Sequence, residues 1–563
     1  MYKTMKFTKI FTTTAVAVGA VLALSGCIRE TFPKESAITE SQLMTGDASV
    51  VLETLLPGIH AGLTFTAGAY EHTDYGYPGW AAYHDFECKN IVANGWLLGN
   101  NPNYNRFMTG ARGYGYAPNS LMPAMTWMGY YPTIKSCNQI IDLAGDSEEY
   151  AKYRGMAKAY RAMLYLDLAR LFDPLYAEAP NYEGAYEDAV LEAQGLTVPI
   201  VTEETIEETA KNNDRATREV MFNFILADLK DAMECLEGYV QEKPFYPTQA
   251  VIHGLYARAY MWLATEDFES DGFNGELPTG MAAYQLALDN AQQALALSGG
   301  AIMSKAEWTN TITGFNTIVP SWMMSVVYSS DTIYSNLHQH SAHLAPEALY
   351  GYSQYTSLGV SKLVYDNLSD GDFRKSLIKG PDTTLADFQA STTIKDESTF
   401  NLFAPYTFFK FRPGNGAQTD STVGGAVSLP LMRCEEMYFI EMEAIYHLQG
   451  AEAARPYLTN FMKNRDTSYV QKPSDKLLEE IIFQKSLEFW GEGIVMYDMK
   501  RLDMGVTCGF KDSNYYVEGR HNSDGRLPWW NYCIPQGELE RNEGIKINNP
   551  DPTEGLDPVT DLQ

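Results

Sequence analysis

Apolar positions repeat at helical spacing in separated blocks along the chain. The clearest block begins near Gly155, and its apolar members recur at steps of three and four residues: Met156, Tyr160, Leu164, Leu168 and Leu171. Such a stripe gives a helix one buried face and leaves the charged residues between its members on the other faces. The pattern ends at Asp173-Pro174, because proline cannot continue a helix. We therefore predict a helix over residues 155–172.

Neighbouring blocks pair into helical hairpins. Residues 126–144 carry a similar stripe and precede the 155–172 helix across a Gly-Asp turn. The further expected helices are 218–236 with 248–264, then 281–297, 433–448 with 452–464, and 477–502. Repeated helix-turn-helix units of this length are typical of tetratricopeptide-like repeats. The predicted helical scaffold spans about residues 121–300 and 431–505.

Long segments rich in Gly, Asn, Tyr and Ser separate these blocks. They cover about residues 64–120, 301–430 and 506–563. Segments of this length without a regular pattern are uncommon in a compact domain unless they carry function. We therefore predict a mainly α fold, in which a large irregular, loop-rich subdomain lies over the helical scaffold and carries the ligand site.

The N-terminal residues are typical of an exported protein with a lipid anchor. A basic start with three lysines precedes the apolar run Ile10–Leu24, as in a secretory signal. The run ends in Leu24-Ser25-Gly26-Cys27, a lipobox whose cysteine accepts a diacylglyceryl group. We expect residues 1–26 to be a lipoprotein signal peptide and Cys27 to be the lipidated mature N-terminus.

The remaining chain is expected to be anchored to a membrane and not to span it. Beyond Cys27 no apolar stretch reaches the ~20 residues that a membrane-spanning helix needs. Acyl chains on Cys27 add roughly 0.8 kcal/mol per buried methylene, enough together to hold a large domain at a bilayer. We expect a tether at residues 27–41, a single domain at residues 42–563, and a place on the outer membrane that faces the cell surface.

The formal net charge of −29 disfavours nucleic acid and anionic lipid surfaces as partners, because both would be repelled. Six cysteines follow Cys27 without a C-x-x-C pair, so no metal cluster or other cofactor is predicted. Buried free thiols are the favoured interpretation; disulfides are the alternative, with Cys508 and Cys533 the nearest pair. His338, His340 and His343 lack a recognised ligand spacing, and we interpret them as part of a polar loop.

An ordered series of motifs runs through the chain. The motifs are Trp127-x3-Tyr131-x2-Ile134-x3-Asn138, Tyr160-Arg161-Ala162 with Tyr165-x-Asp167-Leu168, Asp370-x-Asp372-x-Arg374, Arg433-x2-Glu436-Met437-Tyr438 with Glu443-Ala444, Glu488-Phe489-x2-Glu492-Gly493-x4-Asp498-x2-Arg501, and Ile534-Pro535-x2-Glu538-x3-Asn542 with Asn548-Asn549-Pro550. With the lipobox, this series resembles the SusD/RagB family of outer-membrane nutrient-binding lipoproteins. The resemblance implies tetratricopeptide-like helices packed against a SusC-like TonB-dependent transporter, and a binding face in the irregular region.

Two pairs of adjacent residues depart from the sequence pattern of that family. Gln484-Lys485 and Ile494-Val495 stand where many members have Glu-Arg and Arg-Trp-like residues. For that reason we predict no particular salt-bridge network around them.

A glycan site needs flat aromatic rings with polar side chains beside them, because sugars present apolar C–H faces and hydroxyls. The candidate ligand-binding residues are Trp96, Asn100, Asn101, Tyr75, Tyr77, Trp80, Tyr350 and Tyr352, with Tyr83, Tyr116 and Trp529-Trp530 as further aromatics. Trp96 ranks first, because the family's site lies in the corresponding stretch before the first helical hairpin. The competing interpretation is that these rings only pack against the scaffold.

No catalytic residues are predicted. Glu488 and Glu492 lie one turn apart on one helix face, and we interpret them as ion-pair partners of Arg501 or Lys500. No nucleophile elbow, phosphate loop or dinucleotide fingerprint is present. The predicted function is binding of an oligosaccharide or polysaccharide. Peptide capture by the same scaffold and a pure protein-interaction role remain the alternatives.

Overall fold

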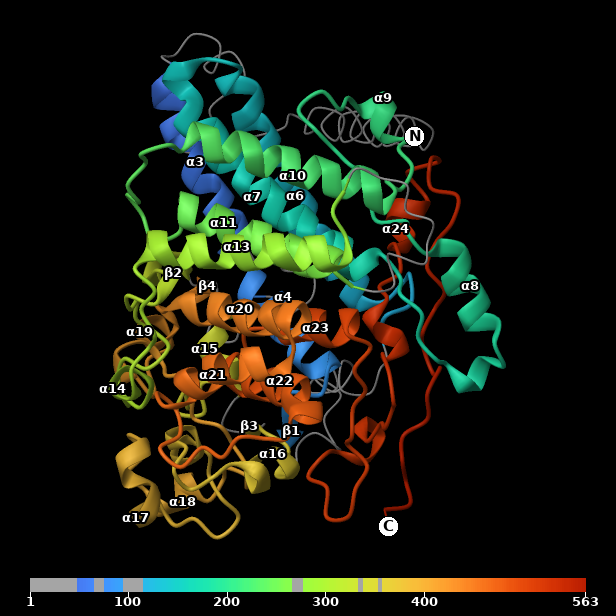
Figure 1. Ribbon diagram of the computed structural model, residues 1–563. Coiled ribbons are helices and arrows are strands. Elements are labelled where there is room, and N and C mark those ends of the chain that lie inside the picture. Colours follow the sequence, from blue (N-terminus) through green and yellow to red (C-terminus); the bar gives the residue numbers. More distant parts are fainter. Residues whose placement is uncertain are drawn as a thin grey trace, which may run out of the picture. The chain divides into compact units, whose positions relative to one another are not determined.

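The computed structural model is mainly helical, as the sequence predicts (Figure 1). It describes residues 48–64, 75–94, 115–265, 277–332, 338–352 and 357–562. The chain divides into two units, Met1–Val51 and Leu52–Gln563, and the fold described below is that of the second. The longer helices are α3 (Ala48–Thr64), α4 (Tyr77–Glu87), α6 (Leu121–Ala144), α7 (Ala151–Phe172), α8 (Ala185–Ala193), α10 (Arg218–Cys235), α11 (Gln249–Leu263), α13 (Gly280–Ser298), α20 (Cys434–Gln449), α21 (Ala451–Met462) and α22 (Leu477–Glu488).

Short helices and two small sheets complete the described part. The short helices are α9 (Glu207–Ala210), α14 (Lys305–Trp308), α15 (His340–Leu344), α16 (Lys362–Asn367), α17 (Leu385–Phe388), α18 (Glu397–Phe400), α19 (Ser421–Gly425), α23 (Val495–Arg501) and α24 (Gln536–Leu539). Strand β1 (Val92–Asn94) pairs antiparallel with β3 (Ser357–Gly359), and β2 (Trp322–Val327) pairs antiparallel with β4 (Ser428–Arg433). None of the helices in the described ranges has the length and apolar character required to cross a membrane.

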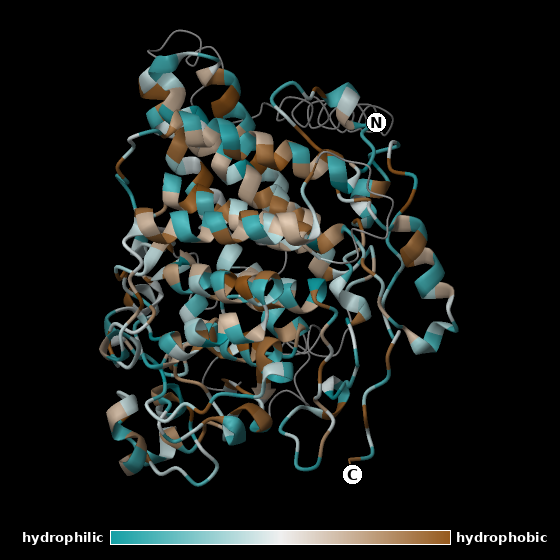
Figure 2. Ribbon diagram, in the orientation of Figure 1, coloured by the Kyte–Doolittle hydropathy of each residue, from teal (hydrophilic) through white to brown (hydrophobic). Residues whose placement is uncertain are grey.

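The predicted hairpins form a stack of helices. Helix α7 packs between α6 and α10, and α13 packs between α11 and α20, which in turn contacts α21. Figure 1 shows this stack running from α10 through α13 and α20 to α22. In Figure 2 brown and teal residues alternate along α10 and α13, as expected for helices with one buried face. The predicted helix limits agree with the observed ones to within two residues, except at the starts of α6 and α7, which begin earlier at Leu121 and Ala151, and within residues 477–502.

Threonine caps fix the starts of two scaffold helices. The Thr217 hydroxyl accepts the backbone N–H of Val220, and the Thr248 hydroxyl accepts that of Val251. Each cap satisfies a backbone donor that has no partner inside the helix and contributes about 1 kcal/mol. The observed starts of α10 and α11 therefore follow from local sequence.

The single helix predicted over residues 477–502 is wrong, because the chain breaks there into α22 and α23. Gly491 and Gly493 adopt positive φ angles of 79° and 72° between the two helices. The break turns the backbone carbonyls of Glu488 and Trp490 toward the buried ammonium group of Lys410, at 2.9 and 2.8 Å. These two carbonyls thus accept hydrogen bonds from a side chain that is distant in sequence. The apolar pattern alone would have continued the helix through this point.

Part of the predicted loop region 64–120 is also helical. Helix α4 begins with Pro78 in its first turn, where proline fits, and buries most of its residues. Gly76 and Pro78 are residue types that are common in loops, but here they stand at the start of a helix. The region 301–430 keeps its predicted irregular character and contains a small separate core of Leu385, Phe388, Ile394, Phe400, Phe403 and Phe409.

The six described cysteines are free, and five of them are buried. This confirms the favoured interpretation over a Cys508–Cys533 disulfide. Burial raises the pKa of the Cys508 thiol to about 11. A thiol held in its neutral form packs as a small hydrophobic side chain.

Candidate functional site

The ladder of β1 and β3 joins the two sequence segments on which ligand residues are predicted. Asn94 pairs with Ser357 at one end of the ladder. The chain therefore enters residues 95–114 and leaves residues 353–356 at the same end. Trp96, Asn100 and Asn101 lie outside the described residues, so their roles stay predictions.

Tyr75 and Trp80 lie in the hydrophobic core. Each side chain is 2% exposed. The ring of Tyr75 stacks on His343 at 4.8 Å between centroids, and that of Trp80 packs on Tyr130 at 5.3 Å. Tyr83 and Tyr116 are buried in the same way. These rings have no exposed face on which a sugar can stack, and they act as the link between α4 and the scaffold.

Tyr77 lines a small internal cavity. Its hydroxyl donates to Asp167 Oδ2 at 2.5 Å, and His84 and Arg258 also line the cavity. The volume is about 50 Å³. That space holds only a few water molecules at about 10–15 Å³ each, so it is too small for a sugar ring.

Tyr350 and Tyr352 precede the segment that leads into β3. Tyr352 is 9% exposed and tilts against the ring of His343 at 5.4 Å. Tyr350 is half-buried beside Gly424, where a β-carbon would come within 2.4 Å of the Tyr350 hydroxyl. Of these two candidates near the ladder, Tyr350 is the one that is partly exposed.

The histidine segment differs from the predicted polar loop. His340 and His343 belong to α15 and are buried. The ring of His340 lies edge-on to Phe411 at 4.6 Å, and burial lowers its pKa to about 3. Within the described residues no group of three or more His, Cys, Asp or Glu side chains has the arrangement of a metal site.

Trp529 and Trp530 also serve the core. Both indole N–H groups donate to the backbone carbonyl of Glu87, at 3.2 and 3.1 Å. The Glu87 carboxyl accepts the hydroxyl of Tyr532. Burial raises the pKa of Glu87 to about 8, although the bond from Tyr532 opposes the shift. A neutral carboxylic acid thus lies in the core at neutral pH.

We expect Glu87→Gln to stabilise the chain at alkaline pH and to have a much smaller effect in mild acid. In the unfolded chain this carboxyl ionises near 4.5, whereas in the folded chain its pKa is about 8. The stability contributed by the protonated group is present below the unfolded pKa and is lost as pH rises through the folded pKa. The stability gained by the variant should therefore grow by about 3 kcal/mol between mild acid and pH ~8. Urea unfolding at both pH values measures it, and an equal gain at both contradicts it.

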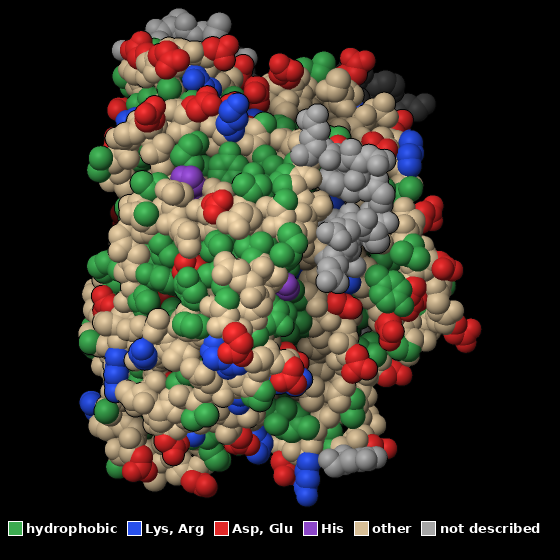
Figure 3. Space-filling model, in the orientation of Figure 1, with side chains coloured by type: hydrophobic (Ala, Val, Ile, Leu, Met, Phe, Trp, Pro, Cys, Tyr) green, Lys and Arg blue, Asp and Glu red, His purple; other side chains and the backbone are tan. Residues whose placement is uncertain are grey.

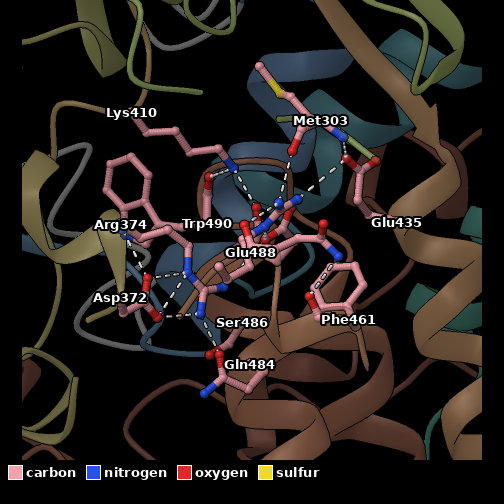
Figure 4. Close-up of polar contacts among 12 residues, drawn as sticks. Met303, Asp372, Arg374, Lys410, Glu435, Phe461, Gln484, Ser486, Glu488 and Trp490 are labelled. Atoms are coloured by element: carbon pink, nitrogen blue, oxygen red, sulfur yellow. Dashed lines mark hydrogen bonds and ion pairs between the residues drawn. The ribbon is translucent and has the colours of Figure 1, made fainter. Parts of the chain in front are cut away.

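Glu488 lies at the centre of a buried ion network (Figure 4). Its oxygens accept from Arg465 at 2.8 and 2.9 Å, and they lie 3.3 Å from Arg433 and 3.4 Å from Arg374. Glu492 pairs with Arg433 at 2.9 Å and with Lys410 at 2.6 Å. Burial alone would raise the pKa of Glu488, but the three guanidinium groups hold that pKa well below its usual range.

The partners predicted for Glu488 and Glu492 are therefore wrong. Arg501 pairs with Glu443 at 2.5 Å and with Asp498 at 2.8 Å. Lys500 instead donates to the backbone carbonyls of Arg170 and Asp173, at 2.8 and 3.1 Å. The sequence pattern placed the two glutamates and their predicted partners on one continuous helix, but α22 ends at Glu488 and α23 begins only at Val495, so the spacing expected for one helix is lost.

Two surface grooves of the described chain have room for a sugar ring. One follows α6 and has adjoining parts of about 260 and 630 Å³. The other has a volume of about 400 Å³ and is lined by Asp372, Asp466 and Lys476 among others. No sequence pattern indicated either groove, because their walls come from segments distant in the chain.

Comparisons with solved structures support the fold. A SusD-like carbohydrate binding protein from Bacteroides vulgatus ATCC 8482 is 20% identical, with a TM-score of 0.64 over 92% of this chain and 99% of that one. A SusD superfamily protein from Bacteroides thetaiotaomicron VPI-5482 is 18% identical, with a TM-score of 0.63 over 89% and 99%. One from Parabacteroides distasonis ATCC 8503 is 15% identical, with a TM-score of 0.63 over 89% and 99%. A comparison with curated proteins found no match.

Family models match the sequence in two places. A SusD-like model described as "Starch-binding associating with outer membrane" matches residues 100–261, which include α6, α7, α10 and most of α11. The model of the SusD family itself matches residues 375–551, which include the ion network around Glu488. By these two matches, which cover scaffold and irregular region alike, the chain belongs to the SusD family.

Proposed function

We propose that the chain is a cell-surface lipoprotein that binds a glycan nutrient and passes it to a SusC-like TonB-dependent outer-membrane transporter without chemical conversion. Its membership of the SusD family carries this proposal, together with its match to the SusD-like model for starch binding and outer-membrane association. The lipobox at Cys27 supplies the anchor that such a location requires. The acidic net charge of −29 suits a neutral ligand.

The glycan site is proposed around Trp96 with Asn100 and Asn101. The described structure supports this location through the β1–β3 ladder, which joins the chain on either side of the site. Tyr350, a partly exposed candidate, precedes β3 in the chain. Aromatic stacking and amide hydrogen bonds together suit a polyhydroxylated ring.

The transporter is proposed to dock on the helical stack. Figure 3 shows hydrophobic side chains gathered over the face formed by α10 and α13. Val220 on α10 and Met281 and Leu297 on α13 are 54%, 55% and 53% exposed. Exposed apolar side chains that gather on one face are typical of a protein interface.

We expect Trp96→Ala to weaken glycan binding by about 1–3 kcal/mol, the loss of a stacking platform and its buried area. A glycan array on the chain lacking residues 1–27 identifies the ligand, and calorimetry on the hits measures the affinity. Tyr457→Ala is the control, because Tyr457 is 41% exposed on α21 and is not among the candidate ligand residues.

Unchanged affinity in a folded Trp96→Ala variant removes Trp96 from the site. A folded chain that binds no glycan on the array contradicts the proposed function. In that case binding of basic peptides becomes the next measurement, since the net charge of −29 favours cationic ligands.

A further inference from the structure

The groove along α6, here called the α6 groove, combines an aromatic floor with a polar rim. Its two parts, of about 260 and 630 Å³, share Tyr131, Val201, Glu207 and Ala210. Helix α6 forms the floor, and residues 199–213 with α9 form one wall. Residues 538–542, beginning in α24, close one end. Figure 1 places α6 and α9 far from β1 and β3, so this groove is separate from the ladder.

Trp127 and Tyr131 supply the aromatic floor. Both rings are half-buried and lie 4.5 Å apart between centroids, tilted by 32°. Other contacts hold them in place: Trp127 lies edge-on to Phe172 at 5.5 Å, and the Tyr131 hydroxyl donates to Pro199 O, in the groove wall, at 2.7 Å. The two rings cover part of one face of each other, and both side chains line the groove.

The wall offers few free backbone groups to a ligand. The Ile200 carbonyl accepts from Asn213 Nδ2 at 2.7 Å, and the Val201 carbonyl accepts from Asn138 Nδ2 at 3.0 Å. The Val201 N–H donates to Tyr165 at 2.7 Å, and the Thr202 N–H donates to the Thr205 hydroxyl at 2.9 Å. A peptide that binds by strand addition needs such groups free. Recognition in this groove must therefore come from rings and side chains.

Four polar side chains at the rim are available for that role. Lys135, Gln139 and Asp142 project from α6, and Arg541 lies at the other end. All four are exposed, and none has a side-chain hydrogen bond or ion pair to another described residue. They supply donors and acceptors of both charge signs beside an apolar floor, which suits a neutral ligand rich in hydroxyls.

The length of the floor fits a chain of several sugar rings. From Trp127 to Asp142 the helix rises by about 22 Å at 1.5 Å per residue. We propose that the α6 groove is a second carbohydrate site, which takes a linear neutral oligosaccharide in addition to the site expected around Trp96. This inference rests on the proposed glycan-binding function and extends it to a part of the chain that the sequence marks only as a helix.

The test measures how many oligosaccharide chains bind and how tightly. Calorimetry with linear malto-, cello-, xylo- and manno-oligosaccharides should show two sites on the chain lacking residues 1–27. Trp127→Leu keeps an apolar side chain but removes the flat ring, and should weaken one of the two sites by about tenfold or more. Lys135→Ala and Gln139→Ala change exposed side chains that the fold does not need, and should weaken the same site severalfold.

The controls separate this proposal from the proposed function. Lys230→Ala, an exposed lysine on α10, should leave both sites unchanged. Trp96→Ala should weaken the other site and leave the one in the α6 groove unchanged. The groove proposal is overturned, and the proposed function left intact, if two sites keep their affinities in Trp127→Leu, Lys135→Ala and Gln139→Ala, or if the unmodified chain has a single site that only Trp96→Ala weakens. A folded chain that binds no oligosaccharide contradicts both.

Discussion

Glu488→Ala should lower the free energy of unfolding by about 3–5 kcal/mol, the usual cost of removing one partner from a buried ion pair. The substitution leaves Arg465 with only the more distant Glu435, at 3.6 Å, as a carboxylate partner. The side chains of Glu488 and Arg465 are fully buried, so water cannot replace the lost charge. Urea unfolding monitored by tryptophan fluorescence measures the change.

Glu452→Ala is the matched control. Glu452 pairs with Arg455 at 3.0 Å, but its side chain is 75% exposed. An exposed pair contributes at most about 1 kcal/mol. Similar losses in the two variants would show that the network around Glu488 is not desolvated as described.

The same network makes the free energy of unfolding depend on pH in the acidic range. The folded chain holds the pKa of Glu488 below its ordinary value of 4.5. Its contribution is therefore present above that value and is lost as pH falls through the folded pKa. This window lies on the acid side of the one expected for Glu87, so the two groups affect different ends of the stability profile.

Gly493→Ala should have an effect of comparable size, at least about 3 kcal/mol from backbone strain and overpacking combined. A β-carbon at Gly493 would lie 1.9 Å from the backbone oxygen of Ala81, and φ is 72°. The backbone must shift, which also pulls the Gly493 N–H away from Asp85 Oδ2, now at 2.9 Å. The yield of folded protein and its urea midpoint measure the loss.

Gly450→Ala separates the two causes. Gly450 has a φ of 87°, and a β-carbon there would meet no atom within 4 Å. This variant carries only backbone strain, about 1–3 kcal/mol, because a φ of 87° with a ψ of 170° lies in a region that side-chain-bearing residues rarely adopt. A Gly493→Ala variant no less stable than Gly450→Ala would contradict the close approach of α4 to the break between α22 and α23.

Both predictions concern the junction between scaffold and irregular region. Arg374 and Lys410 come from the irregular residues 301–430, whereas Glu488 and Glu492 come from the scaffold. Their side chains meet in one buried network (Figure 4). Since separating them would leave unpaired charges in a low-dielectric core, the network holds residues 301–430 in a fixed position on the helices.

The sequence by itself determined the helical hairpins and the family. Helical periodicity acts over a few residues, so α10 and α11 were predicted with nearly their observed limits and α7 with its observed end. The ordered motifs were enough for the SusD family, and the scattered cysteines were correctly interpreted as free. These are local signals, or patterns that do not depend on which residues meet in space.

Only the tertiary structure decided which side chains meet and which are buried. Tyr75 and Trp80 have the same sequence surroundings as an exposed aromatic platform, yet the turn of α4 places both in the core. Glu488 pairs with Arg374, which lies 114 residues away in the sequence. Helix periodicity cannot specify such a pairing. Trp127 and Tyr131 look like an ordinary helix stripe, and only the wall of residues 199–213 turns them into the floor of a groove. Burial and long-range pairing depend on where distant segments pack, and no local pattern records that.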